Sequence, residues 1–319
     1  MKSSVAQSSW FRNTPARISS PSKWDFNNGI DNTTKGNVQY VNQNVATQQK
    51  LAFVDPSSGY AIVRVDNNTK IEAGSSIHRN SIGTISPRLL VTNLICQFPG
   101  VKITSKDAYP IGSLIIIDAI HIPYGCSVQP AFSILGTEMA WPYAGEIDII
   151  EGRNGVGNNS MAMHTGASCS QTSDISQTAQ IGKTLDKDCG TAVGRKVEET
   201  KANSFGAGFA QAGGAFLPLR SAFPVFFYGF GRGDTPTSIS NAIFNTTTDT
   251  SGWGQPSAAY PSADCDIERF FRPHPLRAGI QSNSLSTLRH ALANASRMQL
   301  ATEATMERHI EEFRISELL

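Results

Sequence analysis

The sequence lacks any apolar run long enough to cross a membrane, and it lacks a dominant charge. Its most apolar stretch, Ile111–Ile122, is interrupted by Gly112 and Asp118, whereas a membrane span needs about 18 or more apolar residues. Lysine and arginine number 27 against 26 aspartates and glutamates, so a net charge of +1 provides no field that would gather nucleic acid or anionic lipid. We therefore expect a soluble protein with neither a membrane nor a nucleic-acid partner.

The N-terminus lacks the apolar segment of a secretory signal. Residues 1–23 are polar and rich in serine, which predicts a disordered tail, with a transit peptide as the alternative. The chain nevertheless carries Asn-x-Ser/Thr sequons, which are typical of a secreted protein. An extracellular location is therefore expected, although no signal peptide is visible in the chain. The sequons lie at Asn32, Asn67, Asn158, Asn245 and Asn294.

Cysteine is scarce, with five in the chain. Disulfides are characteristic of secreted proteins, and an odd number leaves at least one cysteine unpaired. A bridge between Cys169 and Cys189 would close a loop of about 20 residues and would stabilise the fold by roughly 3 kcal/mol. This pairing is one of several that the sequence leaves open. The cysteines are Cys96, Cys126, Cys169, Cys189 and Cys265.

Short runs that favour β-structure, separated by turn-forming residues, extend from Trp24 to about Ile280. One example is Tyr60–Val65, in which Ala61, Val63 and Val65 alternate with Tyr60, Ile62 and Arg64 before a polar turn ends the run. This spacing predicts an all-β sandwich or barrel. A chain of 319 residues with 39% apolar content fits one such domain, at residues 24–280, with extensions.

Two segments depart from the strand pattern. Ile82–Gly100 has an apolar stretch between two prolines, and it is either a strand or an insertion; we take residues 82–100 as an insertion. Ser284–Leu319 contains neither glycine nor proline and spaces its apolar residues as a helix does. We therefore expect residues 281–319 to form a helical C-terminal extension. Such a helix would pack on the domain or allow weak self-association.

Three carboxylates, Glu146, Asp148 and Glu151, lie close together on a predicted strand. Glycoside hydrolysis with retention needs one carboxylate that attacks the anomeric carbon and one carboxylic acid that protonates the leaving oxygen, about 5 to 5.5 Å apart. On a regular strand Glu151 would point away from the face that Glu146 and Asp148 share. A β-bulge near Ile149 and Ile150 would return Glu151 to that face. The spacing therefore predicts a bulged catalytic strand.

The alternative is an ordinary edge strand whose carboxylates face water, as charged residues usually do. The flanking residues favour catalysis, because Trp141 and Gly145 precede the carboxylates and Gly152 follows them. Within the group, we expect Asp148 to hydrogen-bond to Glu146 and to help set which carboxyl group holds a proton.

The string Trp141–Gly152 resembles the signature of glycoside hydrolase family 16 in its bulged, laminarinase-type form. Other segments resemble fungal endo-1,3(4)-β-glucanases of that family, so the likeness extends, with interruptions, from Trp24 to Phe271. These segments are Asp25–Gly29, Gly36–Asn42, Ile120–Cys126, Met163–Gly166 and Tyr260–Phe271.

The resemblance implies a concanavalin-like jelly-roll sandwich that cleaves β-1,3 or mixed β-1,3/1,4 glucans with retention. By position, Glu146 is similar to the family nucleophile, Asp148 to the assisting aspartate and Glu151 to the acid/base. Trp141 and His164 are implied to bind substrate. The partner is then a β-glucan, and neither a cofactor nor a metal is expected, because acid, nucleophile and water suffice.

The chain also departs from the family. Relatives usually have Trp-Pro-Ala-Phe-Trp where this chain has Gln129–Ser133, and the loss of two aromatic rings is expected to weaken substrate binding. After Phe271 the predicted helix replaces closing strands, so the jelly roll could be incomplete, with an unpaired sheet edge. Two alternatives therefore stay open: a weakened glucan-binding pseudoenzyme or decayed paralogue, and a transglycosylase, in which sugar intercepts the covalent intermediate.

Overall fold

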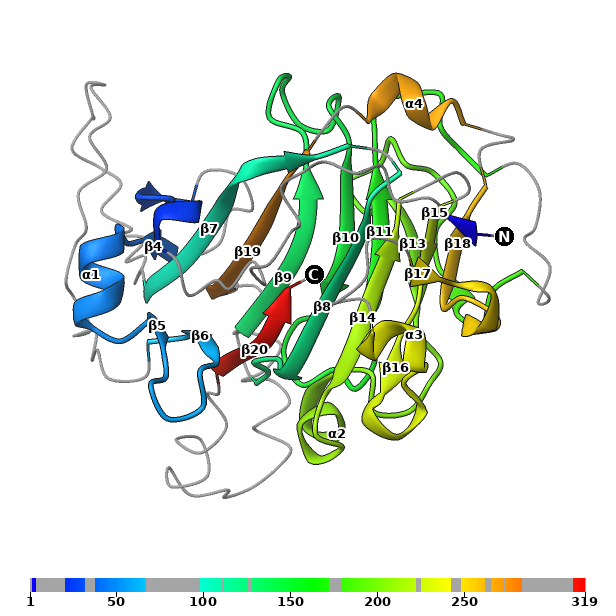
Figure 1. Cartoon of the computed structure of the whole chain (residues 1–319). Helices are drawn as coiled ribbons and strands as arrows, with labels where there is room; N and C mark the ends of the chain where they lie inside the picture. The colour runs from blue at the N-terminus through cyan, green and yellow to red at the C-terminus, as the bar shows by residue number, and fades with distance from the viewer. Residues whose placement is uncertain are drawn as a thin grey trace, which may run out of the picture.

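The computed structural model describes residues 2–3, 21–31, 38–66, 98–110, 112–125, 128–171, 179–221, 225–241, 248–261, 265–271, 274–282 and 312–318. Strands dominate these residues and form two large sheets that share one main hydrophobic core (Figure 1). The predicted all-β sandwich is thus confirmed. Among the helices of these residues, none is long and apolar enough to span a bilayer.

The larger sheet has ten strands in the order β12-β13-β11-β10-β9-β19-β7-β4-β3, and β2 also pairs with β7. All of its pairings are antiparallel except that of β4 with β7. Its strands are β2 (Trp24–Phe26), β3 (Gly29–Ile30), β4 (Val38–Tyr40), β7 (Phe98–Tyr109), β9 (Val128–Leu135), β10 (Glu146–Glu151), β11 (Ser160–His164), β12 (Lys183–Thr184), β13 (Arg195–Glu198) and β19 (His274–Ser282).

The smaller sheet has eight strands in the order β18-β15-β14-β8-β20-β6-β5, and β16 also pairs with β14. Its strands are β5 (Ala52–Val54), β6 (Ala61–Arg64), β8 (Leu114–His121), β14 (Ala215–Arg220), β15 (Val225–Phe227), β16 (Phe230–Gly231), β18 (Ala258–Tyr260) and β20 (Glu312–Leu318). The helices are short: α1 (Gln43–Gln48), α2 (Gly206–Gln211), α3 (Thr237–Ser240) and α4 (Ile267–Phe270).

Side chains alternate between the core and the opposite face along the centre of the larger sheet. Ile147 of β10 pairs with Ile134 of β9 and with Met163 of β11, and all three are buried in the main core. Glu146 and Asp148, one step to either side of Ile147, point to the opposite face. One face of the larger sheet therefore packs in the core, and the opposite face carries the side chains of Glu146 and Asp148.

The most apolar stretch of the sequence forms β8, near the middle of the smaller sheet. Ile115 and Ile117 belong to the main core, whereas Ile116 joins a second cluster with Tyr228 and Trp253. Because both faces of β8 are covered, its sequence is a continuous apolar run in place of an alternating one.

The predicted C-terminal helix is wrong at residues 312–318. These residues form β20, which lies between β6 and β8 and is drawn in red in Figure 1. Charged Glu312 and Arg314 alternate in sequence with apolar Phe313 and Ile315, and this period of two fits a strand. Pairing with two neighbouring strands then decides the structure over the helical spacing. Residues 283–311, the rest of the predicted helix, lie outside the described residues.

The closing strands expected to be missing are present. β19 pairs with β7 on one side and with β9 on the other, in the middle of the larger sheet. β20 fills the corresponding place between β6 and β8 in the smaller sheet. The expectation of an incomplete jelly roll is therefore wrong for these two positions, because residues after Phe271 supply a strand to each sheet.

Two other predicted boundaries also change. Phe98–Gly100, the end of the predicted insertion, begins β7 and pairs with β4 through its backbone, so these residues are part of the sheet. Residues 82–97 lie outside the described residues. In the predicted disordered tail, Lys2–Ser3 pairs with Thr248–Asp249, and Pro21–Lys23 forms a 3-10 turn. These pieces are ordered by backbone pairing and by an ion pair from Lys23 to Asp107, with Nζ and Oδ2 3.2 Å apart.

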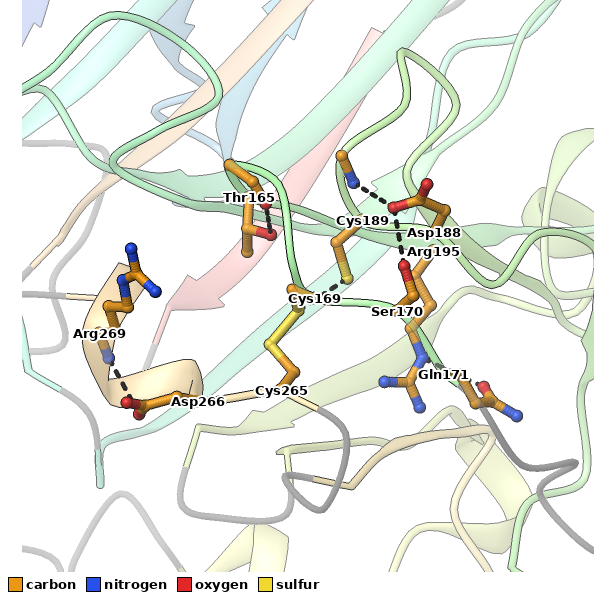
Figure 2. Close-up of a disulfide and its surroundings, with 12 residues drawn as sticks. Thr165, Cys169, Ser170, Gln171, Asp188, Cys189, Arg195, Cys265, Asp266 and Arg269 are labelled. Atoms are coloured by element: carbon orange, nitrogen blue, oxygen red, sulfur yellow. Dashed lines mark hydrogen bonds between the residues drawn. A yellow bond between two sulfur atoms is a disulfide. The ribbon is translucent and has the colours of Figure 1, made fainter.

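A disulfide joins Cys169 to Cys265, and Cys189 is a buried free thiol (Figure 2). Of the pairings that the sequence leaves open, Cys169 with Cys189 is therefore not the one formed, although the Cys189 Sγ lies only 3.1 Å from the Cys169 Sγ. The sequence could not distinguish the two, because Cys265 is distant along the chain and reaches Cys169 only through the fold. Burial raises the pKa of the Cys189 thiol to about 11, which keeps it protonated. Cys96 and Cys126 lie outside the described residues.

Candidate active site

The catalytic strand predicted from the sequence is β10, which lies inside the larger sheet between β9 and β11 (Figure 1). Asp148 and Glu151 are three steps apart on β10. Their partners are only two steps apart on each neighbour: Ser133 and Ala131 on β9, and Ala162 and Ser160 on β11. One extra residue therefore bulges from β10, as predicted. The alternative of an exposed edge strand is wrong.

The bulge places the three carboxylates on one face. Glu151 and Asp148 each pair with residues of the same parity on β9 and β11, so their side chains point the same way. Ile149 and Ile150, between them, are both buried in the core. We call the side of the sheet that carries Glu146, Asp148 and Glu151 the carboxylate face.

Asn159 holds the bulge in place. Its side-chain amide donates a hydrogen bond to the carbonyl oxygen of Ile149 at 2.9 Å, and its side-chain oxygen accepts one from the backbone N–H of Glu151 at 3.1 Å. Two backbone groups that the bulge withdraws from the strand ladder are thereby paired, which a buried backbone requires. Asn159 lies in a polar segment whose sequence indicates only a turn. The sequence therefore does not predict that the Asn159 side chain holds the bulge.

Glu146 is held by two uncharged donors. The indole N–H of Trp141 donates to its Oε2 at 2.7 Å, and the hydroxyl of Ser133 donates to its Oε1 at 3.3 Å. Both carboxylate oxygens therefore accept hydrogen bonds, which fixes the orientation of the group. Ser133 stands at a position where the family usually has tryptophan, so this departure gives Glu146 a hydrogen bond.

Trp141 lies in the loop that precedes β10, and a close contact between Gly145 and Phe271 constrains this loop. Gly145 has φ +81°, and a Cβ there would lie 2.8 Å from the Phe271 ring, so only glycine fits. The loop leaves the Trp141 ring 49% exposed, with its centroid 5.4 Å from that of the His164 ring. An aromatic ring that is half exposed beside three carboxylates can stack on a sugar.

Asp148 pairs with His164, in place of the predicted hydrogen bond to Glu146. The His164 Nε2 lies 3.3 Å from the Asp148 Oδ2, and both residues are 7% exposed. Burial and the charge of Glu146 raise the pKa of Asp148 to about 7. Burial opposes a charge on His164, but the hydrogen bond and the nearby carboxylates outweigh it, so the pKa of His164 is also raised. The two side chains therefore hold a proton between them near neutral pH.

Glu151 has a charged partner. The ammonium of Lys196, on β13, lies 2.7 Å from the Glu151 Oε2, and the two side chains are 22% and 28% exposed. Lys196 reaches Glu151 from two strands away, since β11 lies between β13 and β10. The two ends of β10 thus differ in the charge of the groups that hold their carboxylates.

Two cations lie on the other side of Glu146, at positions that the sequence did not indicate. Arg277 of β19 pairs with Ser133, and Lys102 of β7 pairs with Gly279, which places both on the carboxylate face. Burial and the charge of Arg277 lower the pKa of Lys102, while burial lowers the pKa of Arg277; the charge of Glu146 opposes both shifts. The Lys102 Nζ lies 5.2 Å from the centroid of the Tyr40 ring.

The family model described as "XgeA-like, catalytic GH16 domain" matches residues 24–283 of the chain. The match includes β10 and the whole carboxylate face. The chain belongs to glycoside hydrolase family 16.

Curated relatives of the GH16 domain come from fungi. A "probable glycosidase" of Schizosaccharomyces pombe is 30% identical over 256 residues, which cover 78% of this chain and 52% of the relative. A "probable endo-1,3(4)-beta-glucanase" of Aspergillus fumigatus is 32% identical over 261 residues, which cover 79% of this chain and 34% of the relative. The chain therefore spans between a third and about half of the length of these relatives.

Solved structures share the fold of the GH16 domain. Laminarinase 16A of Phanerochaete chrysosporium, solved with 6-O-glucosyl-laminaritriose in donor and acceptor sites, has a TM-score of 0.75 at 24% identity, covering 93% of this chain and 94% of that one. An elongating family 16 β-1,3-glucosyltransferase has a TM-score of 0.71 at 24% identity, with the same coverage. At this identity the likeness establishes the jelly-roll fold.

The GH16 domain brings all five residues predicted for the site together. Glu146, Asp148 and Glu151 share one face, Trp141 contacts Glu146, and His164 contacts Asp148. His164 is too deeply buried beneath Trp141 to offer much surface to a sugar, so its visible contact is with Asp148. Within the described residues, no group of three or more His, Cys, Asp or Glu side chains is arranged to hold a metal ion.

Proposed function

We propose that this GH16 domain is a retaining endo-β-glucanase that hydrolyses β-1,3 or mixed β-1,3/1,4 glucans. The observation that carries the proposal is the bulged strand β10, which aligns Glu146 and Glu151 on one face and gives them different partners. Two carboxylates with different environments are what a double-displacement mechanism needs. The names of the fungal relatives support a β-glucan as the substrate.

In the first half-reaction, Glu146 attacks the anomeric carbon and Glu151 protonates the departing sugar oxygen. The hydrogen bonds from Trp141 and Ser133 fix the orientation of the Glu146 carboxylate, which supplies the electron pair for the new bond. The glycosidic C–O bond breaks with its electron pair on oxygen, and the proton of Glu151 neutralises that oxygen. The product is a glycosyl ester on Glu146.

In the second half-reaction, Glu151 acts as a base. It now lacks its proton, and it accepts one from a water molecule that attacks the anomeric carbon of the ester. The bond to Glu146 breaks, and both residues return to their starting states. Two inversions at one carbon give net retention, and no cofactor takes part in either step.

Asp148 and His164 limit the negative charge between the two glutamates. Because its pKa is raised to about 7, Asp148 keeps a proton in the resting site and avoids a second negative charge beside Glu146. In the first half-reaction Glu151 gains a negative charge as Glu146 becomes a neutral ester, so the total charge of the three carboxyl groups does not change. The contact with His164 holds Asp148 in place between the two glutamates.

The test is release of reducing sugar from laminarin and from mixed-linkage β-glucan by the full chain, with xylan as a negative control. The expected result is release from one or both glucans, with β-configured products seen first by proton NMR. Release from neither glucan by a folded chain that still binds laminarin would show that the domain is a weakened glucan-binding protein. Longer oligosaccharides formed from a short donor would assign it as a transglycosylase.

The Cys169–Cys265 disulfide supports the further proposal that the chain is extracellular, because such bridges persist in oxidising compartments. A fusion of the full natural gene to a reporter, followed by assay of the culture medium, would test this. Retention of the protein inside the cell, without sugar on its sequons, would overturn it.

A further inference from the structure

Three sulfur atoms meet in the main core, and the chain joins two of them. Cys169 forms the disulfide with Cys265, and the Cys189 Sγ lies 3.1 Å from the Cys169 Sγ (Figure 2). Cys169 and Cys189 are fully buried, and Cys265 is 3% exposed. A thiol in contact with a disulfide sulfur is the starting arrangement for thiol–disulfide exchange. The core therefore holds both a disulfide and a thiol that can attack it.

The backbone already holds Cys169 and Cys189 opposite each other. Ser170 forms an antiparallel bridge with Asp188, one residue further along, and the backbone N–H of Cys189 donates to the carbonyl oxygen of Cys169 at 3.0 Å. Residues opposite each other on antiparallel segments have Cβ atoms about 4.5–5.5 Å apart, and a disulfide needs about 3.5–4.5 Å. The two sulfur atoms would need to approach by about 1 Å to form a bond, so a second disulfide fits this backbone.

The surroundings of the Cys189 thiol act on its pKa in both directions. Burial raises this pKa to about 11, and the charge of Asp188 acts the same way. The charge of the Arg195 guanidinium opposes the shift, as do hydrogen bonds from the Arg195 backbone and the Thr165 side chain. Because the thiolate is the species that attacks a disulfide, exchange should be slow at neutral pH and faster at alkaline pH.

The other end of the disulfide holds residues that pack against the active site. Cys265–Phe271, which we call the α4 segment, runs from the disulfide through helix α4. Its last ring, that of Phe271, packs so closely on Gly145 that a Cβ there would lie 2.8 Å from it, and Gly145 directly precedes Glu146. The disulfide therefore anchors the segment that supports the start of the catalytic strand.

We propose that the three cysteines form a disulfide-exchange site, in which Cys189 displaces Cys265 from Cys169 and releases the α4 segment. The Cys189 thiol first gives up its proton, and its sulfur then attacks the Cys169 sulfur. The bond from Cys169 to Cys265 breaks with its electron pair on the Cys265 sulfur, which takes up a proton. One disulfide and one thiol are present before and after, so the step needs neither oxidant nor reductant.

The first test follows the position of the disulfide in the full chain. Cys96→Ser combined with Cys126→Ser leaves the three cysteines of the site as the only ones. The folded protein is held with iodoacetamide and then acidified, which stops exchange, and its disulfide-linked peptides are identified by mass spectrometry. We expect a Cys169–Cys189 bond with the alkyl group on Cys265, formed about tenfold faster at pH 9 than at pH 8.

Cys189→Ala in the same protein is the matched control, because it keeps the disulfide and removes the attacking thiol. It should retain the bond from Cys169 to Cys265 and take up no alkyl group. Retention of that bond in every molecule of the parent protein, whether or not Cys189 is alkylated, overturns the inference. A rate of exchange that rises with protein concentration also overturns it, because the proposed step occurs within one chain.

A second test asks whether breaking the bond releases the α4 segment. Cys265→Ala breaks it, whereas Cys189→Ala leaves it in place. Tryptic cleavage after the exposed Arg269 should be at least about tenfold faster in Cys265→Ala than in Cys189→Ala. Equal cleavage of the two variants would show that the disulfide does not hold the segment, and it would overturn the release.

The effect on glucan cleavage rests on the proposed function. We expect kcat on laminarin to fall about three- to tenfold in Cys265→Ala, because Phe271 then supports Gly145 less firmly, and to stay within about twofold in Cys189→Ala. Equal activity of the two variants would show that release does not reach the active site. A parent protein that exchanges its disulfide but cleaves no glucan overturns the proposed function and leaves the exchange site intact.

Discussion

The two ends of strand β10 carry the same side chain in different surroundings. Glu146 accepts hydrogen bonds from two uncharged donors, Trp141 and Ser133, whereas Glu151 faces the ammonium of Lys196. The donors to Glu146 come from the loop before β10 and from the adjacent strand, but the partner of Glu151 comes from two strands away. The neighbours of these two identical side chains therefore suit them to different roles.

The largest effect is expected at the Glu146 end. Glu146→Ala removes the group that the proposed mechanism uses as nucleophile, so it should lower kcat/KM on glucan by at least about 10⁴-fold. The measurement is reducing-sugar release from laminarin, with a melting curve to show that the variant is folded. Added azide should restore turnover of an activated substrate and give an azide product of inverted configuration. An azide product of retained configuration would place the nucleophile elsewhere.

The same substitution at the other end should give a contrasting pattern. Glu151→Ala removes the proposed proton donor, so kcat/KM should fall about 10²- to 10⁴-fold for glucan. For a substrate with a dinitrophenolate leaving group the loss should be much smaller, because that group needs no proton. Azide should here yield a product of retained configuration. Uniform loss on both substrates would remove the distinction between the two ends.

A milder substitution removes only the hydrogen bond that Trp141 donates to Glu146. Trp141→Phe keeps an aromatic ring but loses the N–H that donates to Glu146 at 2.7 Å. A charge-assisted hydrogen bond is worth about 1–2 kcal/mol, so kcat/KM should fall about five- to thirtyfold, mainly through kcat. Tyr143→Phe, two residues away on the same loop, is the matched control and should change activity less than about twofold. A fall in Trp141→Phe through KM alone would mean that the indole serves only to bind sugar.

The smallest expected effect concerns the residues between the two ends. The pKa of Asp148 is raised from 3.8 to about 7, so the unfolded chain loses this proton near pH 4 and the folded chain near pH 7. Stability should therefore fall as pH rises between these values. The raised pKa of His164 acts in the same direction, because its stabilising contribution is complete below pH 6.5 and is lost at higher pH.

Asp148→Asn tests this linkage, since the amide cannot ionise and can still accept a hydrogen bond from His164. Between pH 5 and pH 8 the free energy of unfolding of the wild type should fall by about 1–3 kcal/mol more than that of the variant. Urea unfolding at the two pH values measures the difference. Parallel pH dependence in the two proteins would show that Asp148 is ionised throughout.

Local sequence determined most of what could be predicted at the site. The bulge and the shared face of the three carboxylates follow from the residues of β10 and its flanks. Trp141 and His164 are placed in the site by the resemblance to glycoside hydrolase family 16. At Ser133 the sequence shows the loss of an aromatic ring but not the hydrogen bond that the serine makes to Glu146. Asn159 was hidden in a turn pattern for the same reason.

Long-range pairing determined what could not be predicted. Lys196 becomes a partner of Glu151 only because β13 lies next to β11, an order that no local pattern encodes. The Cys169–Cys265 bridge joins residues 96 positions apart, and the nearer Cys189 was the natural choice from spacing. The sequence pattern predicts a helix where β20 lies, because the strands that flank β20 are formed by residues far earlier in the chain.

The position of β20 also determines when the smaller sheet can form during synthesis. Its neighbours β6 and β8 are synthesised early, yet Glu312 must pair with Arg64 before the smaller sheet is continuous. A ribosome-bound chain that has not yet extended past Glu312 exposes two facing strand edges, which are sites of aggregation. Contacts between such distant residues also slow folding. The smaller sheet can therefore become continuous only after Glu312–Leu318 has been synthesised.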